Sequence, residues 1–588
     1  MPLSRPRLSG PVVDATTVAG IHVQQARWTV AWPEDTTSHA VGNVLATRLA
    51  PLTGEGPLNV FDADAAPPAA LLNTAALRLA LRLHSRSGPE FAGFVASAPH
   101  GADSSGFGFC FIDPVVASLA AEWAVKVVHD AARGDALPAD PLGEASLVLG
   151  RIFPGTDSAR VLLEASRRGI PITRLTDHAP AYRLGDGSRQ ATLFRCFTHR
   201  TPQVASVLTT SKATTTQILS RLGFPVPLNQ PVGSLDEARA FVSRIGYPVV
   251  VKPNASDFGQ GVTAEIRDDR QLAAAFARAR PMGDVLVEQH IAGENYRLLV
   301  IDGICRGVNH RVQPDVIGDG ARTIAALMLA KASTMPKYPR PDDPVVAGFL
   351  EGLGRRIDDV PAPGERVRIS AVANASAGGT RVDVTDRVHP ENKRLAEAVA
   401  AAFGIDLAGI DLITPDITRP WQEAGGAINE VNVNPGLPFP AAPGWVLDGL
   451  FPDGSNGRVD VTVIVGHLSG ADVSTITGWV RRGRTPASRN AILGRPTDAG
   501  GGRNPLDPAA ARPIVEQLLG RAELDSLVVQ IAWPGTGPVV SPAPYQSRVL
   551  VNPGVHELAT AIARLRNTAA YCPPVPVSGF DIRAFERG

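Results

Sequence analysis

The sequence predicts a mixed α/β protein of several domains, and three observations support this. A chain of 588 residues is too long for one hydrophobic core and fits about three or four domains. Short β-branched, apolar runs, such as 247–251 and 285–288, predict buried strands. Segments with helical spacing, such as 213–222, alternate with such runs along the chain.

Composition excludes several classes of protein. Hydrophobic residues make up 44% of the chain and the formal net charge is zero, so no general basic field exists to attract nucleic acid. No apolar run approaches the roughly 20 residues needed to span a bilayer, and the first residues lack a secretory signal pattern. The four cysteines lie far apart without a C-x-x-C pair, which favours a reducing environment. We therefore expect a cytoplasmic protein that binds neither nucleic acid nor membrane.

The first 150 residues carry no recognisable catalytic motif. Residues 1–150 are rich in alanine and proline, and the stretches 69–83 and 115–132 have helical spacing. Residues 158–176 predict a helix followed by a strand, which would open the central region of the chain.

Lysine is scarce, because only six of the 57 basic residues are lysines. A lysine that survives such a bias is a candidate for a site that needs a compact point charge. Lys212 stands at the start of the predicted helix 213–222, with Thr210 or Ser211 as its cap. A cation is unfavourable at this end of the helix dipole unless an anion answers it. A triphosphate could be that anion.

Lys252 ends the predicted strand 247–251 and precedes a glycine-containing loop. Glycines let backbone N–H groups approach phosphate oxygens closely. The order of residues differs from that of a Walker P-loop, but strand, lysine and loop together predict a cradle for phosphates. The loop candidates are Ser256, Gly259 and Gly261.

A short linker joins the predicted strands 285–288 and 296–301. The backbone of such a linker can hydrogen-bond an adenine edge while apolar side chains hold the ring. Arg297 and Arg311 follow as candidates for phosphate or carboxylate, although an ordinary surface charge is the alternative for each. The expected adenine and ribose contacts are Glu288, Gln289, Ile291 and either Glu294 or Asn295.

Two predicted strands further on place acids and an amide opposite one another. Asp411 lies within the strand 407–413, and the chain turns back before AINEVNVNPG, in which Glu430 and Asn432 share one face. A solvated edge strand is the plain alternative. However, facing carboxylates repel unless a cation lies between them, and Mg²⁺ prefers one or two carboxylates plus substrate phosphates. We therefore expect Asp411, Glu430 and Asn432 to hold Mg²⁺, with two ions in the site.

In this order, these motifs resemble an ATP-grasp domain, and more closely that of the cyanophycin synthetase family. The resemblance covers roughly residues 150–450 strongly and the preceding residues loosely. It implies an α+β ATP-grasp core, with Lys212 and Lys252 on phosphates, Glu288 and its neighbours on adenine, and the three metal candidates on Mg²⁺. The segments that carry it are YRLGDG (182–187), NYRLLV (295–300), VIGDGARTIAAL (316–327), VANASAGGTRVDVTDRVHPEN (372–392), GIDLAGIDLITPDI (404–417) and GGAINEVNVNPG (425–436).

The sequence departs from the family pattern at three places. Asn295 stands where the family usually has aspartate, and Ser370 lies near the position of a usual arginine, so that Arg297, Arg311 or Arg368 would have to replace it. Residues 331–344 replace a family segment, which predicts an altered lid and substrate.

The C-terminal part departs most. The family continues into a Mur-ligase-like half with its own P-loop, but GHLSGADVST (466–475) has no phosphate-binding lysine at the matching place. The segments 459–465 and 524–533 still predict buried parallel strands with helices between them. We expect three domains: an N-terminal α/β substrate-handling domain (1–150), the ATP-grasp domain (151–450), and a small, degenerate Mur-ligase-like remnant (451–588). The remnant would serve packing, assembly or docking, and a homo-oligomer is expected.

The residues and the resemblance together predict an ATP-dependent carboxylate–amine ligase that works through an acyl phosphate. Lys252, Arg297 and Arg311 would supply the charge that stabilises phosphoryl transfer. The expected substrates are an amino acid or a short peptide, with specialised-metabolite biosynthesis as one setting. A non-catalytic nucleotide-binding scaffold and a D-alanine–D-alanine-like ligase are the alternatives, and no general base is identified.

Overall fold

The computed structural model describes most of the first 465 residues and short strands beyond them. The chain forms two compact units, residues 1–195 with 450–588 and residues 196–449. The described residues are 6–18, 21–33, 48–49, 67–86, 100–111, 113–255, 261–335, 338–370, 373, 378–465, 489–493, 495–496, 503–504, 524–531, 548–551 and 575–576.

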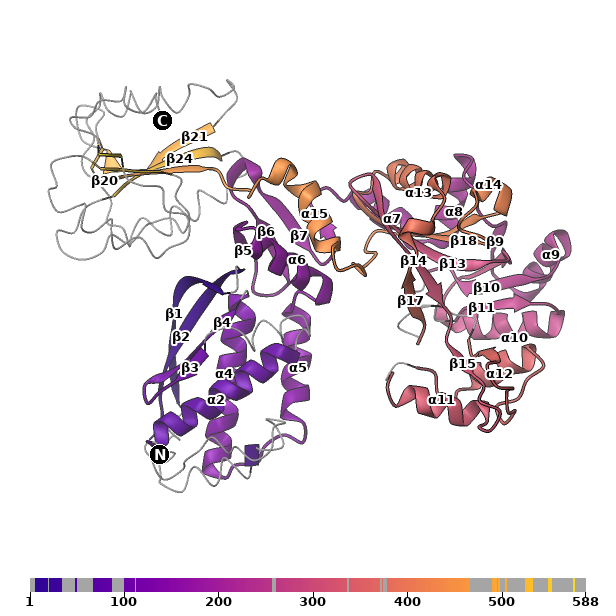
Figure 1. Cartoon of the computed structure of the whole chain (residues 1–588), viewed down its shortest axis with the longest axis horizontal. Coiled ribbons are helices and arrows are strands. Elements are labelled where there is room, and N and C mark those ends of the chain that lie inside the picture. Colours follow the sequence, from indigo (N-terminus) through magenta and orange to yellow (C-terminus); the bar gives the residue numbers. More distant parts are fainter. Residues whose placement is uncertain are drawn as a thin grey trace. The chain divides into compact units, whose positions relative to one another are not determined.

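An antiparallel sheet and two long helices make up the N-terminal part of the first unit (Figure 1). Trp28 stacks on Phe109 with ring centroids 4.9 Å apart, and both side chains are fully buried. The long helices confirm those predicted around 69–83 and 115–132. The strands, in spatial order, are β1 (Arg7–Val18), β2 (Ile21–Ala31), β4 (Gly106–Phe111) and β3 (His100–Ala102), and the helices are α2 (Pro68–Arg86) and α4 (Pro114–Arg133).

Two further helices and a small antiparallel sheet follow in the same unit. The helix and strand predicted over 158–176 are present as α6 and β5. These elements are α5 (Pro141–Ile152), α6 (Thr156–Arg167), β5 (Ile172–Arg174), β6 (Ala181–Leu184), η2 (Gly187–Arg189) and β7 (Ala191–Phe194).

Five of the described C-terminal strands form a parallel sheet, and the parallel pairing agrees with the prediction for the segments 459–465 and 524–533. The segment 466–475, which lacks the P-loop lysine of the family, lies outside the described residues. In spatial order the strands are β21 (Arg489–Leu493), β24 (Leu524–Ile531), β20 (Asp460–Val465), β25 (Arg548–Val551) and β26 (Val575–Pro576), and β22 (Arg495–Pro496) pairs with β23 (Arg503–Asn504).

The second unit contains two larger antiparallel sheets and a two-stranded one, and the first of the larger sheets carries Lys252. Helices α9 and α10 pack against it, and Phe241, Val251 and Leu272 belong to the shared core. The strand of Lys252 runs on to Pro253, so that Lys252 lies within the strand and not after its end. The elements are β8 (Phe197–Thr198), α7 (Gln203–Thr210), α8 (Lys212–Arg221), β9 (Asn229–Val232), α9 (Leu235–Ile245), β10 (Val249–Pro253), β11 (Thr263–Ile266), α10 (Asp269–Ala279), η3 (Arg280–Met282) and β12 (Val285–Gln289), and the sheet order is β11-β10-β12-β9.

The second sheet of this unit carries the acidic strand pair. Helix α13 covers one face of it, where Leu298, Leu395 and Ile410 share a core. The other face is therefore available for polar side chains. The strands, in spatial order, are β17 (Thr380–Asp383), β14 (Ile304–Val312), β13 (Glu294–Ile301), β18 (Leu407–Thr414) and β19 (Ala427–Asn432), and the helices are η5 (Thr385–Arg387), α13 (Pro390–Phe403), α14 (Trp421–Ala424) and α15 (Ala442–Leu450), before η6 (Pro452–Gly454) in the first unit.

A small insert between β14 and β17 has a hydrophobic core of its own, which includes Leu327, Met328 and Leu350. It holds the segment 331–344 that departs from the family pattern. The insert consists of β15 (Asp315–Ile317), α11 (Ile324–Ala332), α12 (Pro344–Gly352) and β16 (Arg366–Arg368).

The described elements confirm the predicted mixed α/β class. No helix in the described part of the chain is long and apolar enough to cross a membrane. The domain boundaries at 150 and 450 stay a prediction.

Candidate active site

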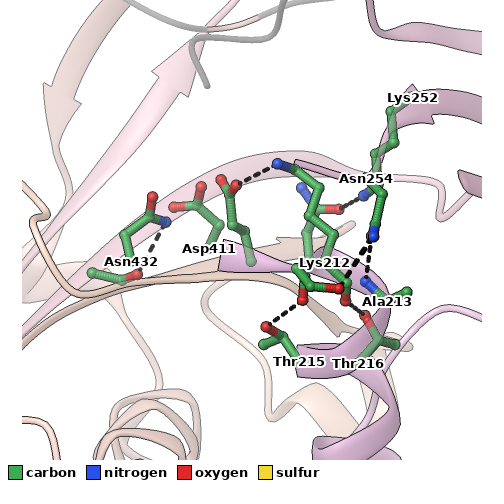
Figure 2. Close-up of polar contacts among 12 residues, drawn as sticks. Lys212, Ala213, Thr215, Thr216, Lys252, Asn254, Asp411 and Asn432 are labelled. Carbon is green, nitrogen blue, oxygen red and sulfur yellow. Dashed lines mark hydrogen bonds and ion pairs between the residues drawn. The ribbon is translucent and has the colours of Figure 1, made fainter. Parts of the chain in front are cut away.

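The strands β18 and β19 bring the three metal candidates to neighbouring positions. Asp411 pairs directly with Glu430, and Asn432 pairs with Gly409 in the same register. Asp411 is buried, whereas Glu430 and Asn432 are half-buried. The Asn432 amide donates to the Gly409 carbonyl oxygen at 3.4 Å. Figure 2 shows Asp411 and Asn432 beside each other, with Lys212 nearby.

Two arginines from the adjoining strands β13 and β14 bind Asp411. Arg297 lies opposite Asp411 in the β13–β18 register and donates to both carboxylate oxygens, with Nη2 to Oδ2 at 2.9 Å. Arg311 Nη1 donates to the same Oδ2 at 3.1 Å. Burial alone would raise the pKa of Asp411, but the two guanidiniums hold that pKa below its ordinary value. Asp411 is therefore ionised and paired with two arginines.

Lys212 begins helix α8, and the structure confirms Ser211 as the cap of that helix. The Lys212 ammonium lies 3.3 Å from Glu430 Oε1, with the lysine side chain 12% exposed. A cation in the first turn is unfavourable with the helix dipole, and the Glu430 carboxylate compensates the charge of Lys212 here. The predicted anion requirement at Lys212 is thus met by a protein side chain.

Lys252 connects the two sheets of the unit. Its ammonium donates to Glu288 Oε1 at 2.9 Å and to Asn429 Oδ1 at 3.2 Å. Lys252 and Glu288 are both buried, so the carboxylate of Glu288 neutralises the charge of the lysine. An adenine contact from the Glu288 side chain would compete with this ion pair.

Sequence reasoning missed Asn429, and a strand irregularity explains why. The β18–β19 register shifts between Asp411 and Leu412, so that Glu430 pairs with Asp411 but Ile428 pairs with Leu412. Strict alternation would turn Asn429 away from the face of Glu430, whereas a bulge re-aims one side chain. No sequence signal in this strand marks the bulge.

The linker after β12 is held by the surrounding backbone. Gln289 N–H donates to the Leu228 carbonyl at 2.8 Å, and Ile291 and Asn295 are half-buried. Gly293 has φ +142°, and an added Cβ there would lie 2.4 Å from the Thr414 carbonyl carbon. The linker therefore lies against the end of β18, close to the acidic strand pair.

Some of the remaining predicted site residues, which are loop residues and arginines, lie within the described part of the chain and some do not. Ser256 and Gly259 lie outside the described residues. Gly261 has φ +72°, and an added Cβ would lie 2.8 Å from Pro253 Cγ, so glycine is required there. Arg368 pairs with Glu265 of β11 at 3.1 Å, and Arg297 and Arg311 are the arginines found on Asp411.

The described residues fit a Mg²⁺–nucleotide complex better than an all-protein metal cage. No group of three or more His, Cys, Asp or Glu side chains that could hold a metal occurs among them. Mg²⁺ commonly takes one or two carboxylates and completes its shell with substrate phosphates, which suits Asp411, Glu430 and the Asn432 amide oxygen. The site joins four cationic side chains, Lys212, Lys252, Arg297 and Arg311, to three carboxylates, Glu288, Asp411 and Glu430.

Comparisons with known proteins agree with the resemblance found in the sequence. Residues 211–297 match the family model of the carbamoyl-phosphate synthase L chain, ATP binding domain. A cyanophycin synthetase of Trichormus variabilis is 34% identical over 332 residues, which is 53% of this chain and 37% of that protein. A glutathione biosynthesis bifunctional protein of Mannheimia succiniciproducens is 32% identical over 247 residues, which is 40% of this chain and 33% of that protein.

The chain thus spans less than half the length of the curated relatives it matches. Among solved structures, the bifunctional glutathione synthetase of Pasteurella multocida aligns with a TM-score of 0.37 and 23% identity, over 57% of this chain and 49% of that one.

Proposed function

We propose that this chain, which resembles cyanophycin synthetases and carries an ATP-grasp core, is an ATP-dependent carboxylate–amine ligase. A carboxylate oxygen of one substrate attacks the γ-phosphorus of ATP, and ADP leaves. The nitrogen of an amine then attacks the acyl carbon of the acyl phosphate, inorganic phosphate leaves, and the nitrogen loses a proton. The product is an amide.

The arrangement of charge around Asp411 and Glu430 supports this proposal most. These facing carboxylates lie within reach of cations from α8, β13 and β14, with Lys252 bonded to the neighbouring Asn429. Phosphoryl transfer depends mainly on positioning and charge neutralisation, so such a site needs no side-chain nucleophile.

Each group has a proposed role. Asp411, Glu430 and Asn432 would hold Mg²⁺, with two ions in the complete site, and the metal would neutralise phosphate charge. Lys212 would leave Glu430, which would then bind the metal, and Lys252 would leave Glu288. Both ammonium groups would bind phosphates instead. Arg297 and Arg311 would orient the substrate carboxylate or the transferring phosphoryl group. Ser256, Gly259 and Gly261 would cradle phosphates, and Gln289, Ile291 and Asn295 would contact the nucleoside.

The substrate class is also proposed. The relatives are named for cyanophycin synthesis and glutathione biosynthesis, and an amino acid or a short peptide is the substrate we propose for this chain. We also propose the three-domain division at residues 150 and 450, and a homo-oligomeric assembly.

The test is ADP release from Mg-ATP with a panel of amino acids and dipeptides as donors and acceptors, with mass spectrometry of the products. The proposal expects ADP and an amide in equal amounts with at least one pair. Mg-ATP binding without turnover on any pair would favour the non-catalytic scaffold instead.

A further inference from the structure

We infer that Asn254 is a positioning residue that fixes Lys212 relative to Lys252, and this inference rests on the proposed function. Asn254 follows Lys252 by two residues and lies beside the first turn of α8 (Figure 2). It is half-buried and has no assigned contact with a substrate.

Hydrogen bonds of both its backbone and its side chain join Asn254 to the beginning of α8. Its backbone carbonyl accepts from Lys212 N–H at 3.1 Å, and its side-chain Oδ1 accepts from Ala213 N–H at 2.9 Å. Its Nδ2 donates to Ser211 Oγ at 3.2 Å, and the same Oγ accepts from Thr214 N–H at 3.2 Å. Asn254 thus satisfies two of the N–H groups that a helix leaves unpaired at its start.

Asn254 is also fixed on its other side. Its own N–H donates to the Asp284 carbonyl at 2.8 Å, immediately before β12. Since Lys252 lies in β10 and pairs with Leu286 of β12, one residue connects the strand of Lys252, the start of β12 and the helix of Lys212.

This connection matters because the backbone position of each lysine determines where its ammonium group can reach. Lys212 occupies the first helical position, where the dipole disfavours a cation, and it reaches Glu430 from there. Lys252 reaches Asn429, the residue before Glu430. Two ammonium groups that must meet one triphosphate require a fixed separation, and errors of about 1 Å are costly in such sites.

The helix start has a second consequence for ligand binding. The N–H groups of Lys212, Ala213 and Thr214 already have acceptors. The Lys212 side chain, and not the backbone of α8, is therefore the group this helix offers to a phosphate. Replacing Asn254 would therefore loosen the first turn of α8, which carries the Lys212 side chain.

The test is a double-mutant cycle on Mg-ATP binding, measured by isothermal titration calorimetry with the full chain. Asn254→Leu keeps a similar volume but removes the side-chain hydrogen bonds, and we expect about tenfold weaker binding, since each such bond contributes modestly. Asn254→Ala provides a second variant if leucine prevents folding. Lys212→Ala provides the second arm of the cycle.

If Asn254 acts through Lys212, the Asn254 substitution will change affinity less than about twofold in the Lys212→Ala background, because the two effects are coupled. An equal loss in both backgrounds, or no loss in the wild-type background, overturns the inference.

A matched control comes from another helix of the same unit. Ser234 caps α9 by accepting from Glu237 N–H at 3.2 Å, and it has no assigned role in the site. Ser234→Ala should lower Tm without changing Mg-ATP affinity. If it weakens binding as much as Asn254→Leu, the effect is structural and the inference fails.

The binding readout separates this inference from the ligase proposal. Wild-type protein that binds Mg-ATP but forms no amide with any substrate would contradict the ligase, while the cycle would still decide the role of Asn254.

Discussion

Asp411 is the residue in which packing and chemistry meet most directly. It lies on the buried strand β18 and binds Arg297 and Arg311, whose charges hold its pKa below the ordinary value and keep the carboxylate ionised. The sequence predicted the acid and its strand, because alternation and the returning chain are both visible in it. The arginines were predicted only as anion binders, since pairing across β13, β14 and β18 depends on a sheet order that local patterns do not encode.

Replacing Asp411 should therefore damage both stability and activity. Asp411→Asn would leave the buried guanidinium of Arg297 and the half-buried one of Arg311 without their carboxylate. Breaking a buried ion pair typically costs about 3–5 kcal/mol. We expect a clearly lower Tm and loss of ADP release.

The control for Asp411 is Glu423→Gln, which removes an exposed ion pair with Arg419. Surface pairs contribute about 0–1 kcal/mol, so Tm should hardly change. An Asp411→Asn protein as stable and active as this control would contradict the assigned role.

Asp186 gives a prediction of pH dependence. Burial raises the pKa of Asp186 to about 6, against the opposing charges of Arg183 and Arg458. Between roughly pH 4 and pH 6 the folded state holds a proton that the unfolded state has lost, so stability falls as pH rises through this window. Above it, the ionised and buried carboxylate destabilises the fold.

Asp186→Asn removes this titration. The variant should gain Tm relative to wild type at pH 7.5 and gain little at pH 4.5, as measured by thermal unfolding at both pH values. The same Tm difference at both would show that Asp186 does not titrate as described.

At the scale of elements, strand periodicity allowed the acidic strand pair to be predicted, but it could not predict the bulge in that pair. Capping chemistry predicted a helix start near Lys212 with Thr210 or Ser211 as the cap, and the structure shows that Ser211 is the cap. The position of Asn429 on Lys252 did not, because a one-residue register shift in β19 leaves no compositional mark. The ion pair of Lys252 with Glu288 likewise depends on how β10 and β12 align.

The linker between the two sheets gives a test at this scale. Gly293→Ala would bring a Cβ to 2.4 Å from the Thr414 backbone at φ +142°, so the linker must move off β18. We expect lower Tm and weaker Mg-ATP binding.

Gly283→Ala is the matched comparison, because Gly283 has φ +125° but open space around its Cβ position. It shares the backbone strain without the clash, and strain of this kind costs about 1–3 kcal/mol. Equal effects of the two substitutions on Mg-ATP binding would show that the linker contact with β18 does not matter.

At the scale of the whole molecule, the parallel C-terminal strands and the mixed α/β class followed from apolar runs in the sequence. The insert of β15, α11, α12 and β16 contains both the family-like segment 316–327 and the departing segment 331–344, but neither segment predicted its separate core. Its salt bridge from Arg368 to Glu265 joins residues 103 positions apart, and such a contact depends on the tertiary fold.

The central claim is that the site activates a carboxylate as an acyl phosphate. The most direct measurement uses a donor from the substrate panel with both carboxylate oxygens labelled with ¹⁸O, followed by ³¹P NMR of the released phosphate. We predict one labelled oxygen in each inorganic phosphate, formed with one ADP and one amide. Unlabelled phosphate accompanying amide formation would contradict the account.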